Sequence, residues 1–226
     1  MSLKKIIQFL PVFSVCSILA GCMNTNYSNI EGYSYVSEAK ELYSGLSSAH
    51  FYIRDNTSGQ ITEDFTFMYN AGGSLAYSHT ATDGEDVYYE YCNGAELSAK
   101  HGKDGNWTLF TYGDEEFHSY TREKKHPYTD GSVISVNAYA ITGSAAEETD
   151  GGRKISFSYD PKALAGSLSE LGELKSFEST IWLNNEGYCF RLDQKAVFEN
   201  NGEQISDYSL FIENMNDVTE IVKPEG

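Results

Sequence analysis

The chain has 226 residues, with 16 Lys or Arg against 33 Asp or Glu, so its formal net charge is -17. A surface this negative repels phosphate backbones, which argues against a nucleic-acid partner. Hydrophobic residues make up 40% of the chain and aromatic residues 14%. This composition is sufficient for a packed core and excludes a chain that is disordered throughout.

The first segment has the pattern of a secretory signal. Two lysines precede an apolar stretch at residues 6–20, which is too short to span a membrane readily. The small residues Ala20 and Gly21 then precede Cys22, and this arrangement resembles the bacterial lipoprotein box, in which the cysteine is diacylglycerated and becomes the new N-terminus. The alternative is an ordinary signal peptide followed by a chance cysteine.

The lipoprotein interpretation predicts where the protein is located. We expect a signal peptide at residues 1–21, acylation of Cys22 by palmitate-type chains, and a lipidated tether at residues 22–35. Two or three acyl chains together hold a protein stably at a bilayer. The predicted localisation is therefore the bacterial cell membrane, with the protein lipid-anchored on the extracytoplasmic side.

Two helices are expected. Residues 34–48 carry apolar side chains at helical spacing with charges between them, which predicts a helix that ends near Gly45. A second helix should begin at Pro161, because Asp160 can cap it and proline is favourable in a first turn. It should run to about Leu171.

Most of the remaining chain alternates between apolar and polar residues, the pattern of an antiparallel sheet with one solvated face. Turn signals such as Asp83-Gly84 and Asn93-Gly94 separate the alternating segments. The predicted fold is α+β and mostly antiparallel β. It is a curled meander sheet, or incomplete barrel, with an N-terminal helix and one inserted helix, forming a single half-barrel domain at residues 36–226.

The apolar face of this sheet exceeds what two helices can cover. Some ten strands about 4.8 Å apart would be roughly 48 Å wide, and two helices about 10 Å in diameter cover less than half of that width. The sheet must therefore close on itself or curl around a cavity that something apolar fills. The aromatic residues of the sheet can be interpreted in two ways, as plain core packing or as the lining of such a cavity. The candidate lining residues are Phe65, Phe67, Tyr69, Tyr89, Tyr91, Phe157, Phe190, Leu192, Tyr208, Leu210 and Ile212.

Of the four cysteines, Cys16 would leave with the signal peptide and Cys22 would carry lipid. Cys92 and Cys189 therefore remain in the folded domain. Outside the cytoplasm a pair of cysteines suggests a disulfide. Two buried free thiols are the other possibility, and the sequence does not decide between them.

The layout resembles that of the LolA-like half-barrel lipoproteins, a group that includes bacterial lipoprotein carriers and the mycobacterial LppX/LprG-type glycolipid binders. The resemblance covers about residues 35 to 223 and is densest near the end of the chain, in Ser179–Leu183, Gly187-Tyr188, Asp207–Leu210 and the tail Val218 to Pro224. It implies an incomplete barrel with helices that plug an apolar cavity able to hold acyl chains. The carriers also hold an arginine at the cavity, but Arg54 alternates out of phase with its apolar neighbours, so that role is not transferred.

No catalytic, metal or cofactor motif stands out. The five histidines have no metal-ligand spacing, and there is no Gly-x-Ser-x-Gly nucleophile motif. We therefore expect a non-catalytic, membrane-anchored lipoprotein that binds an amphipathic or lipid-like ligand in an apolar cavity, without a cofactor. The alternative is a regulatory or interaction module of the cell envelope that binds a protein or peptide.

Overall fold

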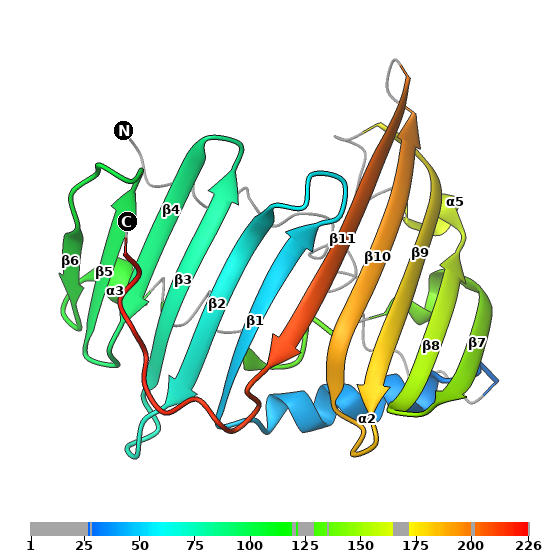
Figure 1. Ribbon diagram of the computed structural model, residues 1–226, viewed down its shortest axis with the longest axis horizontal. Helices are drawn as coiled ribbons and strands as arrows, with labels where there is room; N and C mark the ends of the chain where they lie inside the picture. Colours follow the sequence, from blue (N-terminus) through cyan, green and yellow to red (C-terminus); the bar gives the residue numbers. More distant parts are fainter. Residues whose placement is uncertain are drawn as a thin grey trace.

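A computed structural model describes residues 27, 29–118, 121, 129–134, 136–164, 172–199 and 202–225. They form one open antiparallel sheet of 11 strands in the order β6-β5-β4-β3-β2-β1-β11-β10-β9-β8-β7 (Figure 1). The strands are β1 (Ser48–Asp55), β2 (Ile61–Tyr69), β3 (Leu75–Asp83), β4 (Asp86–Cys92), β5 (Glu96–His101), β6 (Thr108–Thr111), β7 (Ile141–Thr149), β8 (Gly152–Tyr159), β9 (Glu173–Asn184), β10 (Cys189–Glu199) and β11 (Glu203–Glu213).

The chain builds the sheet as two meanders that meet in the middle. Strands β1 to β6 extend to one side, β7 to β11 extend to the other, and β1 pairs with β11 in the register Phe51↔Ile212. Among the described residues β6 and β7 each have one strand neighbour, so they are the two edges. The prediction of a curled, mostly antiparallel half-barrel is confirmed.

Short helical segments accompany the sheet. The longest among the described residues is α2 (Tyr33–Ser44), which crosses the lower end of the strands in Figure 1 and is followed by Gly45 as its C-cap. The predicted N-terminal helix is therefore confirmed. It begins inside the segment expected to be tether.

The inserted helix begins as predicted. Helix α5 (Pro161–Leu164) starts where Asp160 Oδ1 accepts a hydrogen bond of 2.9 Å from the backbone N–H of Lys162. The rest of the predicted helix, residues 165–171, lies outside the described residues. Two further short segments are α3 (Glu115–His118) and the 3-10 helix η3 (Ala138–Ala140).

The hydrophobic core lies on the face of the sheet that packs against α2, which we call the inner face; the opposite side is the outer face. Helix α2 contributes Val36, Ala39 and Tyr43 to this core. Aromatic rings of the core contact one another. The ring centroids of Phe51 and Phe65 lie 5.2 Å apart in a stacked arrangement, and those of Tyr43 and Phe67 lie 6.5 Å apart. Strand alternation thus gives the inner face its apolar side chains, as the period of two requires.

The sharp turns use the residues expected of them. Between β3 and β4 only two residues, Gly84 and Glu85, connect Asp83 to Asp86. Gly84 has φ +58°, a left-handed conformation that glycine adopts without steric cost. This turn fixes the register of the β3–β4 hairpin.

Candidate functional site

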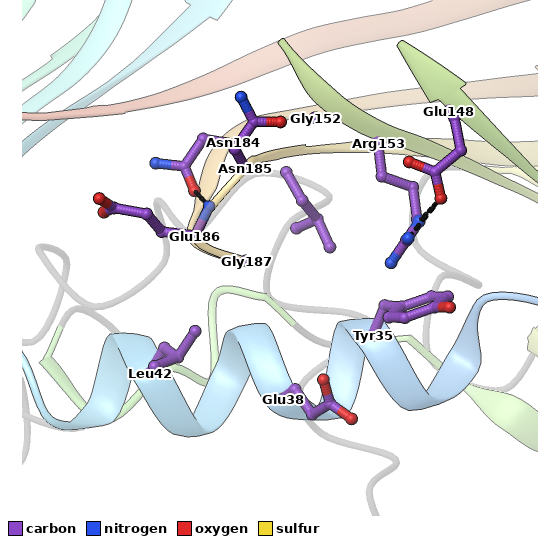
Figure 2. A pocket seen from close by; sticks show the side chains of 11 residues that line it. Tyr35, Glu38, Leu42, Glu148, Gly152, Arg153, Asn184, Asn185, Glu186 and Gly187 are labelled. Carbon is purple, nitrogen blue, oxygen red and sulfur yellow. Dashed lines mark hydrogen bonds and ion pairs between the residues drawn. The ribbon is translucent and has the colours of Figure 1, made fainter. Parts of the chain in front are cut away.

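A pocket of about 270 Å³ lies between α2 and the tips of the β7–β8 and β9–β10 hairpins (Figure 2). Residues three and four apart on a helix share one side, and this places Tyr35, Glu38 and Leu42 of α2 along one wall. The opposite wall comes from the hairpins: Glu148, Gly152, Arg153 and Leu183 to Gly187.

A glycine allows the β9–β10 turn to approach the helix closely. Gly187 has φ +87°, and a Cβ at this position would lie 3.3 Å from Cδ1 of Leu42. Most side chains would therefore strain the backbone at this position, and the end of the Leu42 side chain would have to shift by a few tenths of an ångström. Glycine is thus the residue that fits this close approach best.

The charges in the pocket are only partly compensated. Arg153 forms an ion pair with Glu148, its Nε donating to Oε1 at 2.9 Å, and its Cζ lies 3.5 Å from the centroid of the Tyr35 ring. Within the described part of the chain the Glu38 and Glu186 carboxylates have no cationic partner. The volume is below the roughly 300 Å³ at which drug-sized ligand pockets begin. The pocket can therefore hold a small polar group but not a whole amphipathic molecule.

A buried charged cluster lies elsewhere on the inner face and was not predicted. His79 of β3 contacts Glu63 of β2 through Nε2, and its Nδ1 lies 3.8 Å from Oε2 of Glu90 on β4. Tyr77 donates a hydrogen bond of 3.4 Å from its hydroxyl to the same Glu90 oxygen. Glu63, His79 and Glu90 are 3%, 7% and 3% exposed.

The two carboxylates stabilise the charged form of the imidazole. Burial alone would lower the pKa of His79, but the charge and hydrogen bonds of Glu63 and Glu90 raise that pKa to about 9. The cluster of Glu63, His79 and Glu90 can hold a proton. Because the cluster is buried and solvent does not reach it, we assign it a role in the stability of the fold. The sequence did contain a signal: Glu63 occupies the same alternation phase as Phe65 and Phe67, which face the core.

Eight of the predicted lining residues lie on the inner face. They belong to the core or pack against it: Phe65, Phe67, Tyr69, Phe157, Leu192, Tyr208, Leu210 and Ile212. Several of their rings pack on other side chains of the same face. The pocket does not include any of these eight residues.

Three predicted lining residues are corrected. Tyr89 and Tyr91 lie on the outer face, because the β3–β4 register pairs His79 with Glu90, which puts Glu90 and Cys92 on the inner side. Tyrosines stand on both faces of β4, so hydropathy alone does not define its inner side. Phe190 lies at a bulge between Cys189 and Arg191 and is 39% exposed, because the extra residue interrupts the alternation.

The possible disulfide is also corrected: Cys92 and Cys189 are both buried free thiols. They lie on β4 and β10, with four strands between them in the sheet. Bridged cysteines need Cα atoms within about 7 Å. Burial raises the pKa of both thiols, that of Cys189 to about 12, so both are unreactive in the folded protein.

Other predictions concern residues or groups on which the structure gives limited information. Cys22 and the signal segment lie outside the described residues. In the described ranges no helix combines the length and apolar character needed to cross a bilayer, and no three His, Cys, Asp or Glu side chains are grouped to hold a metal ion. Arg54 lies on the outer face, where its Cζ is 4.9 Å from the ring centroid of Phe211.

No protein-family model matches the sequence, and no curated protein matches it. Among solved structures, the chain is similar to LprF from Mycobacterium bovis, with 14% sequence identity and a TM-score of 0.47. The match covers 87% of this chain and 98% of that one. This likeness assigns no ligand or activity to the chain.

Proposed function

We propose that this protein is a membrane-anchored extracytoplasmic lipoprotein that binds an amphipathic, lipid-like ligand and does not catalyse a reaction. The observation that carries the proposal is the pocket beside α2, because it meets the buried apolar core of the inner face at Leu183 while the rest of its lining is mostly polar.

The pocket beside α2 is the proposed site for the polar end of the ligand. Leu183 belongs both to the pocket and to the buried core, and Leu42 lines the pocket from the helix. An acyl chain that enters past these two leucines would move from water to apolar surface. This transfer would stabilise the complex by about 0.8 kcal/mol per buried methylene. The polar lining would remain in contact with the headgroup.

The proposed anchor would keep this pocket near the bilayer. Helix α2 begins at Tyr33 and the pocket begins at Tyr35. The chain already packs on the domain at Tyr27, whose ring centroid lies 5.7 Å from that of Tyr139, so a free tether from Cys22 to Tyr27 would reach at most about 18 Å when fully extended. The proposed anchor would therefore hold the domain, and the pocket with it, close to the bilayer.

The test is a blocking substitution with a matched control on the same helix. Glu38 lines the pocket, whereas Glu41 is exposed one turn away and does not. Glu38→Trp should fill the pocket and reduce binding of a fluorescent fatty-acid analogue at least tenfold, while Glu41→Trp should leave binding unchanged. Equal binding by the two variants, or no binding by the parent protein, would overturn the proposal.

A second function, recognition of a protein or peptide, has its own supporting observation. The edge strand β6 carries Leu109, which is 56% exposed, and is followed by Tyr112, which is 68% exposed. Among the described residues β6 has one strand neighbour, and an edge strand that carries apolar side chains can act as a template for an added strand. Crosslinking from position 109 on cells should capture one dominant partner, and a diffuse product pattern would remove this candidate.

A further inference from the structure

Two lysines converge on one tryptophan at the outer face of the sheet. The Lys223 ammonium lies 4.1 Å from the ring centroid of Trp107, and the Lys100 ammonium lies 5.3 Å from the same centroid. The two positive charges are therefore at most about 9.4 Å apart, which is comparable to the Debye length of about 8 Å at physiological salt. In a chain with 16 cationic and 33 acidic side chains, this local excess of positive charge is unusual.

Three separate parts of the chain bring these groups together. Lys100 is on β5 and pairs across the ladder with Tyr89 of β4, over whose ring its ammonium lies at 4.7 Å. Trp107 directly precedes β6. Lys223 belongs to the segment after β11, which runs along the lower edge of the sheet toward β5 in Figure 1.

Neither ammonium is neutralised within the described residues. Lys100 is only 7% exposed, yet its one hydrogen bond is the 3.0 Å contact that Nζ donates to the backbone carbonyl of Lys103. An ammonium has three donors. Lys223 contacts the rings of Trp107 and Tyr91, and no carboxylate in the described part of the chain pairs with either lysine.

We propose that Lys100 and Lys223, held beside each other by the ring of Trp107, form a binding site for a phosphate group. A tetrahedral oxyanion can accept hydrogen bonds from two ammonium groups at once, and lysine binds phosphate as a point charge. The negative face of the indole attracts the ammonium groups and so positions them; the anion itself would contact the ammonium groups on the side away from the ring. This site is on the outer face and is independent of the pocket and of the proposed lipid-binding function.

Tryptophan fluorescence gives a direct readout, because the chain has two tryptophans. In full-length protein in a nonionic detergent, Trp182→Phe leaves Trp107 as the only reporter. Titration with sodium phosphate should then change Trp107 emission saturably, whereas sodium chloride at equal ionic strength should not. Identical responses to the two salts would overturn the proposal.

Substitutions locate the site. Lys223→Gln, in an exposed segment, should weaken phosphate binding about fivefold, as expected for the loss of one surface charge interaction. Lys100→Met should abolish binding. The control Lys195→Gln, on the outer side of β10, should have no effect. Phosphate affinity that survives Lys223→Gln unchanged would overturn the assignment even if Lys100→Met fails to fold.

The same titration distinguishes the sources of the phosphate. Inorganic phosphate, glucose 6-phosphate and vesicles of phosphatidylglycerol in phosphatidylcholine are compared in the Trp182→Phe protein. Tighter binding of the sugar phosphate supports a soluble phosphate ester as the ligand. A response to vesicles alone supports a lipid headgroup, and a lack of response to all three contradicts the site.

Discussion

The two faces of the sheet carry aromatic residues in different environments. On the inner face the rings pack on one another and on α2, as in the contacts of Phe67 with Tyr43 and Phe65. On the outer face, cations and rings alternate along one ladder row, Lys154–Trp182–Arg191–Phe211, and the row continues to Tyr52, whose ring stacks on that of Phe211. Aromatic content therefore does not identify the buried face of the sheet, whereas the groups that the rings contact do.

The largest expected difference between the faces is in packing energy. Phe67→Ala should destabilise the protein by about 4 kcal/mol, because Phe67 is fully buried and its removal leaves a cavity. Phe211→Ala on the outer face should cost about 1 kcal/mol, since that ring is half-buried and its partners remain solvated. Urea unfolding of both variants measures the difference, and equal losses would contradict the assignment of faces.

The inner face also contains the Glu63–His79–Glu90 cluster. Disrupting this cluster should lower the free energy of unfolding nearly as much as Phe67→Ala does. His79→Gln leaves Glu63 and Glu90 buried without the imidazolium, so we expect a loss of about 3 kcal/mol. The matched change His50→Gln removes a partly exposed histidine, whose Nε2 lies 3.3 Å from Oδ1 of Asp64, and should cost less than about 1 kcal/mol. If both variants unfold at the same urea concentration, the cluster does not stabilise the fold.

The cluster also predicts the pH dependence of stability. The pKa of His79 is raised from 6.5 to about 9 in the folded protein, so between these pH values the folded state holds a proton that the unfolded state has lost. The free energy of unfolding should therefore fall by up to about 1.4 kcal/mol per pH unit from pH 6.5 to 9. Unfolding midpoints across this range measure the slope. His79→Gln should flatten it, and an unchanged slope in that variant would assign the effect to other groups.

The smallest effect should come from the outer row. Arg54→Gln removes a guanidinium from the ring of Phe211, and exposed contacts of this kind contribute about 0.5–1 kcal/mol. The parent protein and the variant can be compared by thermal unfolding at low and high salt. A loss larger than that of His79→Gln would mean that the outer face contributes more to the fold than its exposure indicates.

Much of the fold was predictable because local patterns determine it. The period of two defined most strands, Gly45 marked the end of α2, and Asp83-Gly84 marked a hairpin. The errors arose where the local pattern is ambiguous. Tyrosines occupy both faces of β4, and the bulge at Phe190 interrupts the alternation in β10.

The candidate sites were less predictable than the fold because they depend on contacts between distant segments. The pocket brings α2 to two hairpins more than 100 residues later in the chain. The Glu63–His79–Glu90 cluster requires the exact register of three strands, and only the phase of Glu63 indicated that it is buried. Lys223 reaches Trp107 through the C-terminal segment, which carries no periodic signal.

Native mass spectrometry of the full-length protein, expressed in a bacterium and solubilised in a mild detergent, tests the proposed function most directly. We expect a species heavier by one lipid-sized mass than the polypeptide with the proposed acyl chains, and reduced occupancy of that species in Glu38→Trp relative to Glu41→Trp. A single species with the mass of the acylated polypeptide alone, in the parent protein and in both variants, would contradict it.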